Sequence, residues 1–314
     1  MHPAKSVIYF TTASGAGYGL FVMAWALSTL LEVPAYHGLG LAIFGTSFFL
    51  IVTGLLASTL HLGHPERAWR AFSQWRSSWL SREGVASIVF FIPAGIYAWG
   101  WISEGINTGA YQIIGGVAAL LALVTVFCTA KIYSSLKTIP AWHDPLTVPG
   151  YLLLSLLTGG VLFLPISQLW FLEAEQGLRL AVLFLNILAM GLKLFYWRGI
   201  KERTPVETAA SATGLKGKVT LLEGPHDQKN YLMKEMGFKI ARKHASKLRA
   251  FALAFTFMMP FAMIILSPYG PPDYAFGLLT VAVFFTAVGI ALERWLFFAE
   301  AKHVQTLYYG EEGV

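Results

Sequence analysis

Eight long apolar runs restrict this chain to one kind of fold. A helix needs about 20 apolar residues to cross the hydrocarbon core of a bilayer. Windows of this length lie roughly at residues 8–31, 39–61, 84–102, 111–134, 149–170, 178–198, 248–267 and 274–295. The runs are continuous rather than alternating with a period of two, which indicates helices and not the strands of a membrane barrel. With 56% hydrophobic and only 13% charged residues, we expect a single all-α integral membrane domain, residues 1–314, with eight transmembrane helices.

The first apolar run bears on whether the N-terminus is a signal peptide, and the single cysteine bears on disulfides and metal clusters. The run near the N-terminus is long, lacks a clear small-x-small cleavage site and is followed by seven more, so we expect a retained helix rather than a signal peptide. Cys128 lies inside the fourth run and has no second cysteine to pair with. Disulfides and thiolate clusters are excluded, and any iron–sulfur centre must belong to another subunit.

Charged residues predict the orientation of the helices. Eight spans put both termini on one side of the membrane, and of the 23 lysines and arginines only Arg179 falls on the other side. By the positive-inside rule, both termini and the segment 61–84 face the cytoplasm. Orientation accounts for the net charge of +6, so no nucleic-acid partner is needed to explain it.

One long cytoplasmic loop, residues 199–247, joins the sixth and seventh spans. It carries a basic stretch from Lys229 to Arg249. Two interpretations stay open, a basic helix lying on anionic lipid headgroups or a docking surface for a soluble subunit.

The segment between spans two and three predicts a helix that lies in the membrane interface. Pro65 suits a first helical turn. Trp69, Phe72, Trp75 and Trp79 recur at three- and four-residue steps and would share one face. These aromatic residues form either an ordinary interfacial belt or part of a binding site.

His61 and Glu83 flank this segment, one at the end of span two and one at the start of span three. Joined by a short hairpin, they can face each other at similar depth. An imidazole and a carboxylate at the water boundary can hydrogen-bond a quinone and exchange protons with it. The structural alternative is a histidine that caps a helix and a glutamate that pairs with Arg82 or Arg67.

Polar residues elsewhere allow structural interpretations. His143 and Asp144 either complete a pocket or turn the chain. For Glu293 and Arg294, near the inner end of span eight, we expect structural pairing. The eight histidines include none at mid-span, which favours no haem and no other metal in this chain.

Several short motifs resemble the membrane anchor of dimethyl sulfoxide reductases. They are His61-Leu62-Gly63, Arg67-Ala68, Leu80-Ser81 with Glu83, Lys131-Ile132-Tyr133 and Thr138-Ile139-Pro140-Ala141-Trp142. The resemblance covers the whole chain except the loop 199–247. Within this family, the run from His64 to Ala68 is more similar to anchors of the cytoplasmic sulfite-quinone oxidoreductases, the sulfite dehydrogenases. The predicted cytoplasmic face supports this choice, because the corresponding face of bacterial dimethyl sulfoxide reductase is understood to be periplasmic.

The resemblance implies a quinone-reactive anchor in the inner membrane. It implies an iron–sulfur partner subunit of the four-cluster ferredoxin kind, which serves a catalytic subunit with molybdopterin. From the resemblance we expect the quinone to be ubiquinone or menaquinone and favour oxidation of sulfite to sulfate as the reaction. In this family the histidine of the first motif and the glutamate of the third are linked to quinol handling, which carries over to His61 and Glu83.

The predicted quinone-binding and proton-transfer residues cluster on the cytoplasmic side. They are His61, Glu83, His64, Arg67, Arg70, Arg76, Trp79, Tyr133 and His143. The arginines and Trp79 would shape the headgroup pocket or hold the iron–sulfur subunit. Two other functions are alternatives: an anchor that oxidises quinol for an S-oxide, N-oxide or polysulfide reductase, and a transporter, which predicts charges near mid-membrane.

Overall fold

Helices make up most of the described structure. The computed structural model describes residues 5–60, 64–170, 175–203, 208–220, 222–223 and 244–309. Its elements are α1 (Lys5–Leu30), α2 (His37–Thr59), η1 (Pro65–Gln74), α3 (Trp79–Trp99), η2 (Gly100–Glu104), α4 (Ala110–Ser134), α5 (Thr147–Gln168), α6 (Glu175–Arg203), α7 (Ala209–Thr213), α10 (Ala245–Leu253), η3 (Ala254–Met258), α11 (Met259–Leu266), η4 (Ser267–Tyr269), α12 (Pro272–Ala299) and η5 (Val304–Tyr309). The elements η1, η4 and η5 are 3₁₀-helices, and η2 and η3 are π-helical turns within longer helices.

Within the described residues, eight helical segments are long and apolar enough to cross a membrane. They are Lys5–Leu30, His37–Thr59, Trp79–Glu104, Ala110–Ser134, Thr147–Gln168, Glu175–Ile200, Ala245–Tyr269 and Pro272–Ala299. The predicted all-α fold and the predicted number of spans are confirmed.

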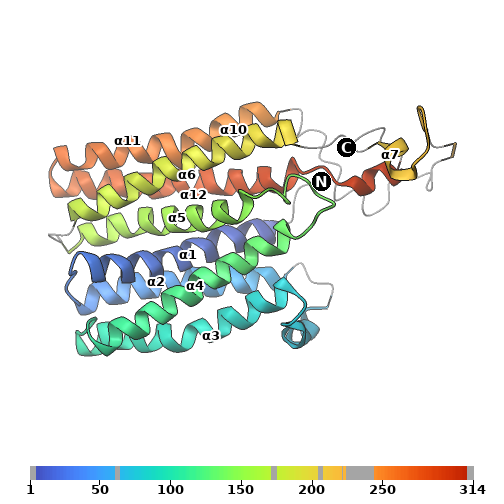
Figure 1. The fold of residues 1–314 in the computed structure, drawn as a ribbon. Coiled ribbons are helices and arrows are strands. Elements are labelled where there is room, and N and C mark those ends of the chain that lie inside the picture. Colours follow the sequence, from blue (N-terminus) through green and yellow to red (C-terminus); the bar gives the residue numbers. More distant parts are fainter. Residues whose placement is uncertain are drawn as a thin grey trace.

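The spans form two groups that meet along α1 and α5. In the first group α1 packs on α2 and α4, and α3 packs on α4. In the second group α5 packs on α6 and α12, and α11 packs on α12. Helix α1 begins and α12 ends at the end of the bundle that also carries η1 and α7, as Figure 1 shows. We refer to this end as the η1 end.

Two glycines allow α1 and α5 to touch backbone to backbone. A Cβ atom on Gly19 would lie 1.8 Å from the carbonyl oxygen of Ser155, and one on Gly159 would lie 2.0 Å from the carbonyl carbon of Gly19. The hydroxyl of Ser155 donates to the carbonyl oxygen of Gly15 at 2.5 Å. Without a hydrophobic driving force between helices in lipid, such close contacts hold spans together.

The third span begins earlier than the sequence predicts. The apolar run predicts a start at residue 84, but α3 starts at Trp79, because the side chain of Ser78 accepts the backbone N–H of Ser81 at 3.4 Å and caps the helix. Glu83 therefore lies inside the helix rather than before it.

The predicted loop 199–247 is only partly described. Helix α6 continues to Arg203, and a short helix, α7, follows. Residues 224–243, with most of the basic stretch, lie outside the described residues. Both interpretations of that stretch stay predictions.

Candidate functional site

A large cavity opens between the first four spans at the η1 end. Its volume is about 780 Å³, and most of its wall is apolar. The wall consists of Val7, Phe10, Val52, Leu55, Leu56, Ser58, Thr59, His64, Arg67, Ala68, Ala71, Phe72, Leu80, Glu83, Gly84, Ser87, Ile88, Phe91, Ile132 and Tyr133. An apolar cavity of this size with a few polar groups is typical of a small-molecule site. We call it the η1 cavity.

Glu83 is the buried carboxylate of the η1 cavity. It lies in the second turn of α3 and is only 4% exposed. The hydroxyl of Thr129, on α4, donates a hydrogen bond to its Oε1 atom. No Lys or Arg of the described residues pairs with Glu83, so the predicted alternative of an ion pair with Arg82 or Arg67 does not occur there. Burying a carboxylate without a cation costs free energy. Such carboxylates are typical of functional sites.

The helix η1 covers the cavity and is held by its neighbours. Arg82 donates from Nε to the carbonyl oxygen of Trp75 at 2.9 Å and from Nη2 to that of Arg76 at 2.7 Å, so it satisfies backbone groups just after η1. The ring of Phe72 lies against Gly84, where a Cβ atom would come within 2.7 Å of it. The missing side chain of Gly84 thus lets η1 approach α3.

The predicted aromatic stripe is divided between two helices. Trp69 and Phe72 are three residues apart and share a face of the 3₁₀-helix η1, and Trp75 follows three residues later, directly after its end. The fourth member, Trp79, is instead the first residue of α3, because the backbone turns at residues 75–78. The other three side chains are exposed, and Phe72 also lines the cavity.

Three further predicted residues line the η1 cavity with Glu83. His64 and Arg67 come from the segment that covers it, and Tyr133 comes from α4. Glu66 links the first two, with its Oε1 atom 3.0 Å from Nδ1 of His64 and 3.7 Å from Nε of Arg67. The ring of Tyr133 is fixed by neighbouring aromatic rings, including that of Trp142 at 5.4 Å between centroids.

The other predicted site residues lie outside the cavity wall. The guanidinium carbon of Arg70 lies 5.6 Å from the ring centre of Trp69, and that of Arg76 lies 5.5 Å from the ring centre of Trp75. Trp79 contacts two cations, Arg82 at 4.3 Å and Lys131 at 5.5 Å. His143 is exposed on the loop after α4, its Nδ1 atom 2.6 Å from the carbonyl oxygen of Ser134, as in the structural alternative. His61 lies outside the described residues.

Sequence reasoning missed Thr129, the partner of Glu83. A signal for it was available, because Thr129 precedes Tyr133 by four residues and therefore lies on the same face of its helix. A threonine in an apolar run usually bonds its own helix, however, and Thr129 also contacts the carbonyl oxygen of Thr125 at 3.1 Å.

A second buried polar group lies between α6 and α12. The carboxylate of Glu293 is fully buried and pairs with Lys193 through Oε1 and with Nη1 of Arg294 through Oε2, the latter at 3.4 Å. The expected pairing of Glu293 and Arg294 is present, with a third member. The charge pattern assigns Lys193 and Arg294 to the loop face, but both are buried inside the bundle. We call these three residues the buried triad.

No three His, Cys, Asp or Glu side chains gather into a metal-binding group among the described residues. The expectation of neither haem nor another metal stays a prediction.

The fold defines a multi-pass membrane protein, and the η1 cavity is a large, mostly apolar hollow at one end of it. The family model of the DMSO reductase anchor subunit (DmsC) matches residues 1–310, and the protein belongs to this family. It is therefore a membrane anchor of an oxidoreductase complex.

Individual relatives agree with this assignment. The sequence is 31% identical to the C subunit of sulfite dehydrogenase from Allochromatium vinosum over 346 aligned positions, which cover 98% of this protein and 99% of that one. It is 29% identical to the C subunit of anaerobic dimethyl sulfoxide reductase from Escherichia coli over 148 positions, which cover 46% of this protein and 50% of that one. The resemblance stated from the motifs, both to the family and to a sulfite dehydrogenase anchor, is confirmed.

Proposed function

We propose that this anchor passes electrons between a partner's iron–sulfur clusters and a membrane quinone bound in the η1 cavity. One observation carries the proposal: a buried carboxylate, Glu83, on the wall of a mainly apolar cavity of about 780 Å³. Apolar walls suit the hydrocarbon part of ubiquinone or menaquinone. The polar groups suit the headgroup, whose oxygen atoms change protonation when it is reduced.

The residues of the cavity take separate roles. Glu83 hydrogen-bonds a quinone oxygen and exchanges a proton with it, while His64, Arg67 and Tyr133 orient the headgroup. His61, which lies outside the described residues, keeps the role that the family motif gives it. Arg70, Arg76 and Trp79 lie away from the wall and are suited to docking the iron–sulfur subunit beside η1.

The favoured reaction is oxidation of sulfite. At the molybdopterin of a partner catalytic subunit, sulfite and water give sulfate, two protons and two electrons. The electrons cross the iron–sulfur subunit, and the quinone takes up two electrons and two protons. Similarity over nearly the full length of a sulfite dehydrogenase subunit supports this reaction. The distribution of basic residues supports an inner-membrane protein whose docking face is cytoplasmic.

Substitution of Glu83 tests the proposal. In the assembled complex, Glu83→Gln keeps the shape of the side chain and removes its capacity to carry a proton. We expect quinone-linked turnover to fall roughly 10²-fold, the size of a general acid–base contribution. Electron transfer from sulfite to an artificial acceptor, which bypasses the anchor, should be unchanged.

Glu104→Gln is the matched control. Glu104 belongs to the same membrane span but lies at its other end, where it is exposed and accepts a hydrogen bond from Tyr111 at 2.8 Å. This variant should keep full activity. Quinone-linked turnover at the wild-type rate in Glu83→Gln would contradict the proposed role, and solute flux through the purified anchor alone would favour a transporter instead.

A further inference from the structure

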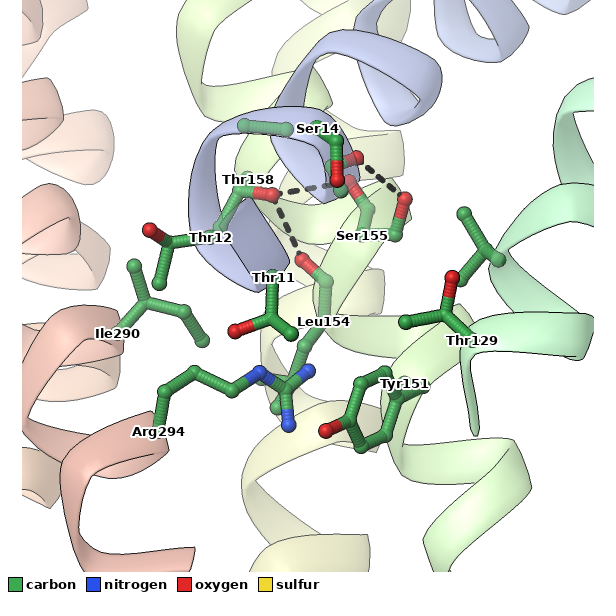
Figure 2. Close-up of a pocket in the computed structure, with 13 residues that line it drawn as sticks. Thr11, Thr12, Ser14, Thr129, Tyr151, Leu154, Ser155, Thr158, Ile290 and Arg294 are labelled. Carbon is green, nitrogen blue, oxygen red and sulfur yellow. Dashed lines mark hydrogen bonds between the residues drawn. The ribbon is translucent and has the colours of Figure 1, made fainter. Parts of the chain in front are cut away.

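Two small cavities lie between Glu83's partner, Thr129, and the buried triad. The first has a volume of about 10 Å³ and lies between α1, α4, α5 and α12. Hydroxyl groups surround it, and Thr129, Tyr151 and Arg294 are all part of its wall. Figure 2 shows Arg294 reaching from α12 toward Tyr151 of α5, with Thr129 on the α4 side of the same space.

The second cavity is equally small and continues toward α6. Its volume is about 10 Å³, and its wall includes Tyr151, Lys193, Tyr196, Glu293 and Arg294. Tyr151 and Arg294 therefore border both cavities, with the guanidinium carbon of Arg294 3.7 Å from the centre of the Tyr151 ring. Because they share Tyr151 and Arg294, the two cavities together form a path from Thr129 to the buried triad.

Unpaired polar atoms mark where water belongs along this path. The hydroxyl oxygen of Tyr151 and Nε of Arg294 are buried, and neither has a hydrogen-bond partner among the described residues. Buried polar groups in proteins are almost always paired, with ordered water where no protein group is available. A volume of about 10–15 Å³ accommodates one water molecule, so each cavity is large enough for a single water that would pair these atoms.

We propose that this path conducts protons between the buried triad and Glu83, which rests on the proposed role of Glu83 at the quinone. The hydroxyl of Thr129 already donates to Glu83. When Glu83 has given its proton to a reduced quinone, Thr129 passes its hydroxyl proton to the carboxylate and takes one from the water of the first cavity. Tyr151 and the water of the second cavity restore that proton from the side of the triad. In quinol oxidation the same transfers run in reverse.

The position of the triad fits a proton supply better than a structural tie. Leu146 and Thr147, where the backbone enters α5 from the loop at the η1 end, also line the second cavity. The path therefore begins just beneath the loop surface on the side where the quinone takes up protons. A tie between helices at this end is already provided by Arg249 and Glu300, which join α10 to the end of α12 with distances of 2.7 to 3.1 Å.

Thr129→Val tests the path in the complete complex, because it keeps the shape of the side chain and removes the hydroxyl. We expect kcat for quinone-linked turnover to fall at least 10-fold, the KM for quinone to stay unchanged, and the solvent deuterium isotope effect on kcat to increase. Thr129→Ser should restore the wild-type kcat and isotope effect. Tyr151→Phe, which removes only the unpaired hydroxyl, should slow turnover in the same way.

Thr125→Val is the matched control. Thr125 lies one turn earlier on α4, is also buried, bonds the carbonyl oxygen of Leu121 at 2.8 Å and lines neither cavity. The path is wrong if Thr129→Val and Tyr151→Phe both keep the wild-type kcat and isotope effect and Glu83→Gln still turns over slowly. A merely structural role would lower the yield of complex without changing the isotope effect. Wild-type turnover in Glu83→Gln would refute the role of Glu83, and the path would lose its end point.

Discussion

At the scale of the residue, burial separates the predicted site residues into groups. Glu83 is buried on the cavity wall, whereas Arg70 and Arg76 are exposed and lie over tryptophan rings. The sequence places all of these in one polar segment and cannot rank them, because exposure depends on how η1 lies on α3. Thr129 is the opposite case, a site residue that the sequence did not predict. Only the packing of α4 against α3 makes it a partner of Glu83.

An alanine on the covering helix η1 provides a test of where the quinone binds. Ala68 lines the η1 cavity, and Ala68→Phe would fill part of it. Steric exclusion predicts that the KM for quinone rises about 10-fold, as for a poorly fitting group in an apolar pocket. Steady-state kinetics with a short-chain quinone would measure this.

The control for added volume is Leu41→Phe, at an exposed position on α2 that does not line the η1 cavity. Its kinetics should match those of the wild type. An unchanged KM in Ala68→Phe would place the quinone elsewhere.

At the scale of the element, most helices follow from local sequence. Apolar runs of sufficient length predict all eight spans, since the backbone must satisfy its own hydrogen bonds in lipid. The start of α3 is the exception that matters for the site. Hydropathy detects apolar side chains and not the cap at Ser78, so it misses the polar first turn. The prediction that Trp79 shares one helix face with the other three aromatic residues is wrong for a related reason. A turn at residues 75–78 interrupts the helical spacing.

The contact between α1 and α5 makes a prediction about packing. Gly159→Ala places a methyl group about 2.0 Å from the backbone of α1, so the helices must move apart. We expect a loss of about 1–3 kcal/mol in stability, as for other overpacked interiors. The thermal unfolding temperature of the purified anchor in detergent should fall accordingly.

Gly191→Ala is a suitable control, because a Cβ atom at Gly191 meets nothing within 4 Å. It should unfold at the wild-type temperature or slightly above it, given the better helix propensity of alanine. Equal unfolding temperatures for the two variants would show that the contact tolerates a side chain.

At the scale of the whole molecule, the two groups of spans divide the polar residues between them. The η1 cavity belongs to α1–α4, and the buried triad belongs to α6 and α12. Moving Lys193 and Arg294 into the bundle leaves the predicted orientation intact, because 20 of the 23 lysines and arginines, all except these two and Arg179, still fall on the N-terminal side of the predicted topology.

The orientation itself can be measured by cysteine labelling. Cys128 is buried and can be replaced in a Cys128→Ser background. Ser135→Cys places an exposed thiol at the η1 end, and Thr108→Cys places one at the opposite end. A membrane-impermeant maleimide should label only Thr108→Cys in right-side-out vesicles and only Ser135→Cys in inverted vesicles. The reverse pattern would contradict a cytoplasmic η1 end.

The sequence by itself determined the membrane environment, the number of membrane spans and the gathering of polar residues at one end of the bundle. These properties follow from composition and local periodicity. Only the tertiary structure decided which polar groups meet, since Thr129 and Glu83 are 46 residues apart and Lys193 and Glu293 lie on different helices. Helices in lipid are equally apolar on many faces, so hydropathy cannot say which faces pack together. Close backbone contacts such as that of Gly19 with Gly159, together with buried hydrogen bonds, make that choice.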